Sequence, residues 1–214
     1  MIKNPFDISF NNLPESLPIY DVRSELLLPG GQIPLHIFEV KYLNMIQDAL
    51  AAKDRMIGIV LPKSDNSKGM YDIGCAGRIT SFEETTDGRF LITLTGYCRF
   101  HLKDAIPSIR GYKRYSVDWS NYKNDLYIDP NSDIDRDGLI SILIDYSEAL
   151  SIDMDWHVLS QVPNFNLITF FAMSLPFDIK DKQILLSAHT AEERADVLIA
   201  MIKDAMKNKD ADRN

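Results

Sequence analysis

Residues 77–100 read GRITSFEETTDGRFLITLTGYCRF. Between residues 90 and 95 every second side chain is large and apolar (Phe90, Ile92, Leu94), which is the period of a half-buried β-strand. Another short apolar run occupies residues 78–82, and the Asp87-Gly88 pair between the two runs is typical of a tight turn. This stretch therefore predicts a β-hairpin.

Further short apolar runs separated by Pro or Gly lie on both sides of this hairpin, at residues 17–19, 25–28, 56–61 and 115–119. Many short strands predict a barrel or a sandwich. One helix interrupts them, because apolar residues recur at helical spacing from Leu43 to Leu50 and no Pro or Gly falls between residues 39 and 55.

The apolar spacing becomes helical from about residue 135 onward. Amphipathic helices are predicted at 139–150 and 195–206, the second opened by a capping box at Thr190 to Glu193. Residues 164–174 are apolar almost all round, so Phe170, Phe171 and Met173 are predicted as bundle core, and 178–188 as a further short helix. We therefore expect an α+β fold with a barrel or sandwich of strands at 1–120, a helical bundle at 121–206 and a frayed tail at 207–214.

Composition excludes several classes of protein. The 214 residues are 45% hydrophobic and 25% charged, which is typical of an ordinary globular chain. Residues 1–120 hold 14 Lys and Arg against 14 Asp and Glu, and residues 121–214 hold 9 against 17. A chain with no basic face is a poor partner for nucleic acid. No apolar run approaches the roughly 18 residues of a membrane span, and the N-terminus does not read as a signal peptide, so we expect a cytoplasmic protein that does not enter membranes.

Two stretches together resemble the N-terminal domain of Lon proteases. Residues 17–42 read LPIYDVRSELLLPGGQIPLHIFEVKY and share with that family an opening Leu-Pro, a Pro-Gly turn and the PLHIFE motif; residues 77–100 add its DGR hairpin and Gly-x-x-Arg-Phe. Residues 164–202 resemble the helical tail of the same domain. Val40 and Lys41 stand where the family usually has Pro and Arg, and residues 121–135 match no part of the pattern. The resemblance implies a PUA-like β-barrel with one inserted helix, followed by a helical bundle, in a module that recognises protein substrates or partners.

The catalytic motifs of a full-length Lon are missing from these 214 residues. None of the ten glycines begins a GxxxxGK[ST] phosphate loop, and no Ser has the Gly-flanked context of the family's Ser-Lys pair. We therefore expect a stand-alone module that is not an enzyme, with no catalytic residues and no cofactor.

Two motifs suggest metal chemistry, but neither is complete. Residues 133–140 match the first eight positions of an EF-hand loop from Asp133, yet the twelfth position, which should be Glu, is Ile144. The favoured alternative is that Asp135 or Asp137 caps the next helix. Cys98 and His101 lie three apart on a strand and so point to opposite faces. We expect no metal site, and two reduced, buried cysteines.

A polar pair in the PLHIFE motif, His36 and Glu39, flanks the predicted strand and helix. These side chains either line a peptide groove or tie the strand to the helix, and the second interpretation is favoured because polar residues at element boundaries usually satisfy local backbone groups. Arg78 and Arg99 are interpreted as structural, each paired with Glu39 or another carboxylate. Phe38 is expected to anchor the junction of barrel and helix.

The polar stretch at residues 62–70 is predicted to be a surface loop that either carries recognition or is a tolerated insertion. The residues predicted to contact a peptide, if one binds, are drawn from this loop and from the PLHIFE region: Pro34, His36, Phe38, Glu39, Lys63 and Met70.

The leading hypothesis is a non-catalytic module whose barrel and bundle share a cleft that holds unfolded or tagged polypeptides for a proteolytic machine. Strand edges and apolar pockets suffice for such binding. Two alternatives stay open: an RNA-binding PUA-like protein, which a salt-sensitive gel shift would support, and a small-molecule enzyme using His36 or Cys98, which needs a pocket with a convergent acid or base. The sequence does not fix the oligomeric state.

Overall fold

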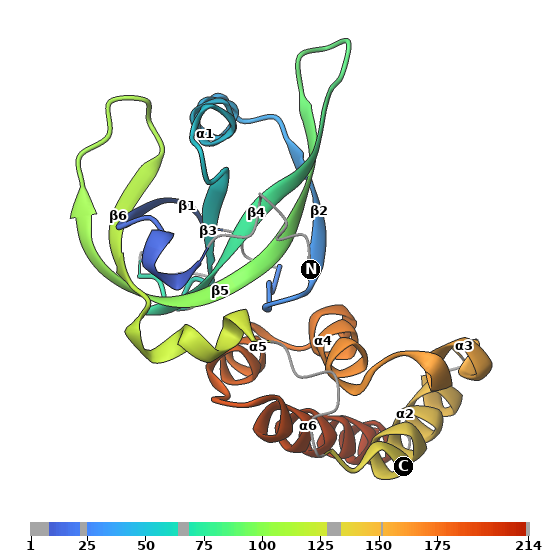
Figure 1. Ribbon diagram of the computed structural model, residues 1–214. Helices are drawn as coiled ribbons and strands as arrows, with labels where there is room; N and C mark the ends of the chain where they lie inside the picture. The colour runs from blue at the N-terminus through green and yellow to red at the C-terminus, as the bar shows by residue number, and fades with distance from the viewer. Residues whose placement is uncertain (1–8, 22–24, 64–68, 128–133, 151, 213–214) are drawn as a thin grey trace. The chain divides into compact units, whose positions relative to one another are not determined.

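The computed structural model describes residues 9–21, 25–63, 69–127, 134–150 and 152–212, with side chains as far as residue 207 (Figure 1). Packing divides the chain into two compact units, Met1–Tyr127 and Ile128–Asn214. The first holds a β-sheet and the second is helical, so the fold is of the α+β class. Within the described residues, no helix has both the length and the apolar character needed to cross a membrane.

The first unit is a six-stranded sheet that closes on itself. Its strands are β1 (Ser16–Asp21), β2 (Gln32–Ile37), β3 (Met56–Val60), β4 (Ile73–Glu84), β5 (Phe90–Ile106) and β6 (Lys113–Asp118). The strand order is β2-β5-β4-β3-β1-β6, and β5 also pairs with β6. The first half of β5 pairs with β2 and its last part pairs with β6, so β2 extends beyond the closed ring as an edge strand (Figure 1). The PUA-like type of this barrel stays a prediction.

The predicted hairpin at residues 77–100 is confirmed as the β4–β5 pair. Phe90, Ile92 and Leu94 are buried, as the alternation predicts. Gly88 at the turn has φ +78°, a left-handed conformation that glycine adopts without a Cβ clash. Farther along β5, Phe100 is fully buried and contacts Trp119 edge to face at 5.7 Å between ring centroids.

The strand predicted at residues 25–28 does not form. Leu26, Leu27 and Leu28 are all buried, whereas a half-buried strand would bury alternate side chains. The segment ends in a turn in which Gly31 donates to the Leu28 carbonyl at 3.0 Å. It crosses β5 so closely that a Cβ on Gly96 would lie 2.0 Å from the Leu28 oxygen. The leucines fill the core as an irregular segment that only a glycine in β5 admits.

The helix predicted between residues 39 and 55 is α1 (Val40–Ala51), and polar contacts from β1 and from the β5–β6 loop hold it. Tyr42 Oη donates to Asp21 Oδ1 at 2.6 Å, and Asp48 accepts from Arg110 at 2.6 Å and from Tyr112 Oη at 2.8 Å. Burial alone would raise the pKa of the Asp21 carboxyl, but hydrogen bonds from Lys113 and Tyr42 lower it below its ordinary value. The helix is thereby fixed against β1 and the β5–β6 loop.

Residues 121–127 belong to the first unit, not to the helical part as predicted. Residues 121–126 lie in a 3-10 helix, η2 (Ser120–Leu126), that packs on β5. Asp125 accepts from Arg99 Nε at 2.9 Å, Nη2 at 2.7 Å and the backbone N–H at 2.8 Å. The pair is buried, and although burial alone would lower the pKa of Arg99, the bonds and charge of Asp125 raise it. This ion pair, invisible in a hydrophobic pattern, joins η2 to β5.

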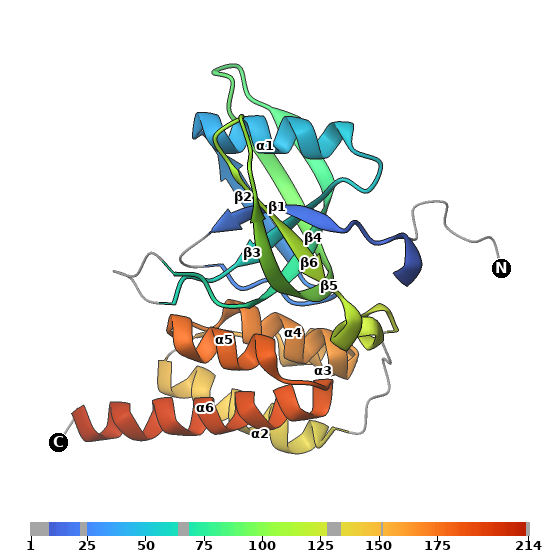
Figure 2. The ribbon, with the colours of Figure 1, turned by 90° about the vertical axis from the view of Figure 1, so that its left-hand side faces the viewer.

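The second unit consists of helices α2 (Arg136–Leu150), α3 (Trp156–Gln161), α4 (Asn164–Ser174), α5 (Ile179–Ser187) and α6 (Ala191–Asp212) (Figure 2). Helices α2, α4 and α5 each pack against α6. The short helix α3 has no counterpart among the predictions. The predicted frayed tail is helical as far as Asp212, and residues 213–214 lie outside the described residues.

Two side chains at the start of α6 satisfy backbone groups. Thr190 Oγ1 accepts from the Glu193 N–H at 3.1 Å, as the capping box predicts, but the Glu193 carboxylate accepts from the His189 N–H instead of the Thr190 N–H. Buried Arg194 donates to the Leu185 carbonyl at 2.9 Å and so caps the end of α5.

Helix α4 buries Phe171, with Met173 half-buried, but Phe170 is 56% exposed. The prediction that all three residues form core is therefore wrong for Phe170. Burial on every side would require partners all around the helix, and no residue of the described ranges fully covers the side of Phe170.

The Leu28–Gly96 contact predicts that Gly96→Ala destabilises the first unit by at least about 2 kcal/mol, because the added methyl overlaps a backbone oxygen that cannot move without shifting the leucine segment. Urea unfolding followed by Trp fluorescence measures this free energy. Gly88→Asn is the control: a Cβ there meets nothing within 4 Å and Asn tolerates the left-handed φ, so its cost should be under about 1 kcal/mol. Equal midpoints for the two variants would refute the steric argument.

Removing one partner of the buried ion pair leaves the other charge without compensation. Asp125→Ala should therefore lower the free energy of unfolding by about 3–5 kcal/mol. Lys103→Ala, which breaks the exposed 3.4 Å pair with Asp118, should cost less than about 1 kcal/mol. A cost for Asp125→Ala no larger than that for Lys103→Ala, in the same urea titration, would show that Arg99–Asp125 does not hold η2.

Candidate functional site

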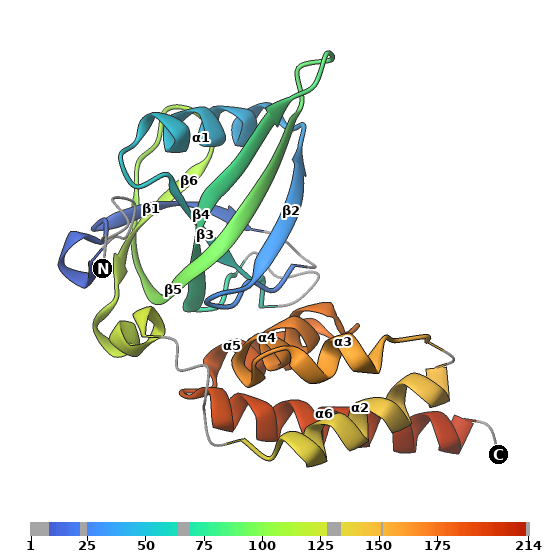
Figure 3. The same ribbon diagram turned by 45° about the vertical axis from the view of Figure 1, so that its right-hand side comes forward.

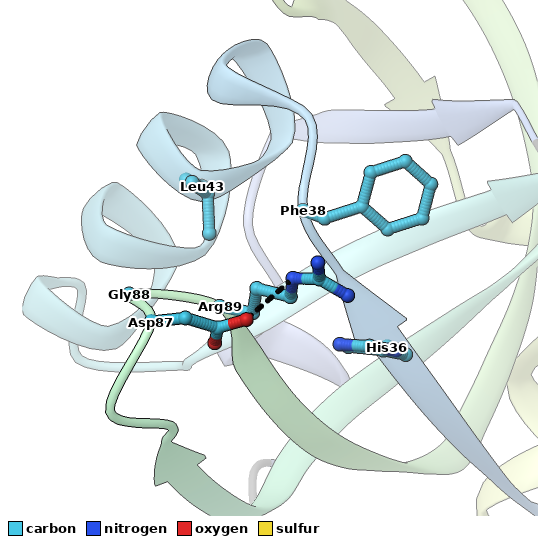
Figure 4. Close-up of a pocket in the computed structure, with 6 residues that line it drawn as sticks. All are labelled: His36, Phe38, Leu43, Asp87, Gly88 and Arg89. Carbon is cyan, nitrogen blue, oxygen red and sulfur yellow. Dashed lines mark ion pairs between the residues drawn. The ribbon is translucent and has the colours of Figure 1, made fainter.

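The end of β2, the start of α1 and the turn of the β4–β5 hairpin meet around an open pocket of about 470 Å³ (Figure 4). His36 and Phe38 come from the strand and the residue just after it, Leu43 from α1, and Asp87, Gly88 and Arg89 from the turn. The pairing of Ile37 with Phe90 explains this meeting, because it aligns the last residue of β2 with the first residue of β5.

Phe38 does not anchor the junction of barrel and helix as predicted. Its side chain is 62% exposed and lines the pocket, with its ring edge to face with His36 at 6.0 Å between centroids. Ile37 fills the buried position on the inner face, so Phe38, one residue later, is turned outward. A large exposed aromatic ring beside a pocket is available to a ligand.

The ionic side chains at the pocket neutralise one another. Arg89 Nε lies 3.0 Å from Asp87 Oδ2, and Lys41 Nζ lies 3.3 Å from Glu39 Oε2. A hydrogen bond from Thr85 and the charge of Arg89 lower the pKa of the Asp87 carboxyl. The cations are thus already paired, which leaves no strong attraction for a phosphate group.

His36 and Glu39 do not tie the strand to the helix through their side chains. His36 makes no side-chain hydrogen bond in the described structure, and the Glu39 side chain makes none to the backbone of the helix N-terminus. The Glu39 backbone carbonyl accepts from the N–H groups of Tyr42 and Leu43, both at 2.9 Å. The pocket lining contains no Ser, Thr or Cys, so His36 has no hydroxyl or thiol to activate there. The structural interpretation of this pair is not supported.

The other predicted contact residues divide between two places. Pro34 is exposed on β2, two residues before His36 and on the same face. Lys63 and Met70 border the β3–β4 connection, where Pro62 bridges Met70 and Lys63 lies 3.6 Å from Asp72; residues 64–68 lie outside the described residues. That connection precedes β4 and the pocket turn follows it, so the 12-residue strand separates them.

Neither structural arginine lines the pocket. Arg99 pairs with a carboxylate, as predicted. The partner is Asp125, which lies in residues 121–135, the stretch that matched no part of the family pattern. Arg78 is half-buried in β4, opposite Met56 on one side and Thr95 on the other.

No group of three or more His, Cys, Asp or Glu side chains able to hold a metal occurs in the described part of the chain. Asp135 caps α2 by accepting from the Gly138 N–H at 3.0 Å, as the favoured alternative to calcium predicts, and Asp133 lies outside the described residues. Both cysteines are buried and free, and burial raises the pKa of Cys98 to about 12 and that of Cys75 well above its ordinary value. Burial and a raised pKa both disfavour the reactive thiolate form of these two side chains.

Two exposed apolar residues near α1 escaped the sequence interpretation. Val40 is 72% exposed at the start of the helix and Ile109 is fully exposed in the β5–β6 loop. Arg110 holds this loop on α1: it donates to Asp48, and Asn44 donates to its carbonyl at 3.2 Å. The available signal was an isoleucine in the short segment Pro107 to Gly111 between two strands. We call the pocket together with Phe38 and Val40 the α1 end; Figure 1 shows α1 between the β4–β5 hairpin and the β5–β6 loop.

Two solved structures share this fold. A Lon N-terminal domain protein from Xanthomonas campestris is 23% identical with a TM-score of 0.59 and matches 86% of this chain and 97% of its own. The N-terminal domain of Mycobacterium avium complex Lon protease is 17% identical with a TM-score of 0.58, over 88% of this chain and 98% of its own. These similarities show the fold.

Curated relatives extend the comparison to whole proteins. The chain is 27% identical to Lon protease of Flavobacterium johnsoniae over 88% of this chain, and 26% identical to Lon protease of Amoebophilus asiaticus over 91%. In both cases the match covers 24% of the relative, so this chain spans about a quarter of their length.

The family model for the ATP-dependent protease La (LON) substrate-binding domain matches residues 16–204. This range includes every strand and all of the helices α1 to α5, with most of α6. Sequence family, closed sheet and helical unit agree, and the chain therefore belongs to the LON substrate-binding domain family.

Proposed function

We propose that this chain is a non-catalytic module that binds polypeptide segments through the α1 end and holds them for a proteolytic machine. The observation that carries the proposal is the exposed ring of Phe38 at the wall of a pocket of about 470 Å³, with Val40 also exposed two residues farther along the chain. Large apolar groups that a folded chain holds in water mark interaction sites when they cluster.

The α1 end is preorganised for binding. Tyr42 donates to Asp21 and Arg110 donates to Asp48, which fixes the helix, and the hairpin turn lines the pocket. A ligand therefore orders few protein side chains, which reduces the entropic cost of association.

Polypeptide fits this surface better than the alternatives do. Unfolded segments expose the apolar side chains that Phe38 and its neighbours would cover, and a protease family's substrate-binding domain acts on polypeptides. Lys41 and Arg89 are already in ion pairs, which argues against RNA, and His36 has no hydroxyl or thiol beside it, which argues against a small-molecule enzyme.

The test is the affinity of the full chain for reduced, carboxymethylated α-lactalbumin, a permanently unfolded protein, measured by fluorescence anisotropy. We expect Phe38→Ser to weaken binding by about tenfold or more, because burying a Phe side chain is worth about 1.5–3 kcal/mol. Phe38 is exposed in the free protein, so its replacement should leave the urea midpoint unchanged.

The matched control is Tyr127→Ser, which removes another exposed aromatic ring from the same unit, just after η2 and outside the α1 end. Its affinity should equal that of the unsubstituted chain. No binding by the unsubstituted chain, or equal losses in both variants, would refute the proposal.

A further inference from the structure

Strand β2 carries an open edge next to the pocket. In the described part of the chain it pairs on one side with β5, from Gln32 opposite Thr95 to Ile37 opposite Phe90, and it stands last in the strand order. The backbone groups of its other side are therefore available (Figure 3). An unpaired edge of this kind is a template for another strand.

The hydrogen-bond pattern identifies which groups face outward. Gly96 donates to the Gly31 carbonyl at 2.8 Å, so the Gly31 backbone faces β5. Backbone groups alternate in direction along an antiparallel pair, and hence those of Ile33, Leu35 and Ile37 also face β5. Those of Gln32, Pro34 and His36 face the open edge.

Pro34 agrees with this assignment. Proline lacks an N–H and occurs in sheets where that position faces away from the neighbouring strand. The open edge accordingly offers the carbonyls of Gln32, Pro34 and His36 but only the N–H groups of Gln32 and His36. His36, the residue nearest the pocket, can make two backbone hydrogen bonds with an incoming strand.

The ion pairs around His36 favour an uncharged side chain on the incoming strand. A residue opposite His36 has its Cβ about 5 Å away on the same face, beside Phe38. The ionic groups at this place, Asp87 with Arg89 and Glu39 with Lys41, already hold one another. A charged incoming side chain would have to displace one of these partners, whereas an uncharged apolar side chain meets Phe38 without competition.

We infer that β2 binds an extended polypeptide segment by strand addition, with His36 as the main backbone partner and an uncharged apolar residue of the segment opposite it. This inference rests on the proposed function and specifies how the polypeptide is held: the backbone contributes binding independent of sequence, and the pocket beside Phe38 selects the apolar residue.

The experiment uses the full chain and a fluorescein-labelled nine-residue peptide, Lys-Thr-Val-Thr-Phe-Thr-Val-Thr-Lys, in anisotropy titrations. His36→Pro removes the outward N–H without touching the bonds to β5, and His36→Ala, its matched control, removes only the imidazole. We expect His36→Pro to bind about three- to tenfold more weakly than His36→Ala, because it loses one backbone hydrogen bond. Pro34→Ala restores the missing donor and should bind about threefold more tightly.

A second readout keeps the inference testable if His36→Pro fails to fold. N-methylation of the Phe and both Val residues keeps every side chain of the peptide but removes the donors that would face β2. The methylated peptide should bind the unsubstituted chain at least threefold more weakly.

The outcomes separate the two proposals. Equal affinities of the methylated and unmethylated peptides, with Pro34→Ala unchanged and Phe38→Ser still weakened, overturn strand addition and leave polypeptide binding intact. A third outcome is that the chain dimerises with increasing concentration, that His36→Pro abolishes the dimer and that the peptide does not compete with it. This outcome also overturns peptide binding by strand addition, because the edge then pairs with a second copy of the chain. No binding of the peptide or of unfolded α-lactalbumin overturns both.

Discussion

The first unit depends on one strand that serves three partners. The 17 residues of β5 pair with β2 and β4 near its start and with β4 and β6 farther on, so the sheet closes only if β5 changes direction along its length. Register shifts between Ala76 and Gly77 in β4 and between Leu102 and Ala105 in the β5–β6 pair accommodate that change. Gly96, near the middle of β5, then leaves room for the leucine segment of residues 26–28 to cover the core. Hairpin, ring closure and core are consequences of the same strand.

The same strand also creates the candidate site. Because β5 leaves β2 to join β6, β2 remains outside the ring with one edge open, and the hairpin extends beyond the barrel toward α1 (Figure 1). The residues after β2 therefore reach the hairpin turn, and α1 is held by Asp21 and by the loop that precedes β6. The pocket of the α1 end is therefore lined by residues 36–43 and by the turn at residues 87–89, which are distant in sequence.

Local sequence patterns correctly predicted the elements that are stabilised by residues close to one another along the chain. The alternation at residues 90–95, the Asp-Gly turn and the helical spacing after residue 135 each depend on neighbours along the chain, and each is confirmed. Residues 25–28 were misinterpreted because three consecutive buried leucines satisfy a hydrophobic pattern in any extended conformation. Asp125 was missed because its partner, Arg99, lies 26 residues away, and the role of Phe38 was misjudged because hydrophobicity alone does not say which face of a strand end is covered.

A single proline in β2 also affects how strongly the protein tends to aggregate at high concentration. An edge strand with every backbone donor available would recruit identical strands one after another, as fibrils do. Pro34 lies between the two outward N–H donors, those of Gln32 and His36, and has no N–H of its own. A short bound peptide tolerates this missing hydrogen bond, whereas a sheet that grows from molecule to molecule would miss it at every added strand. The residue that limits what the edge can hold thus also protects the free protein from aggregation.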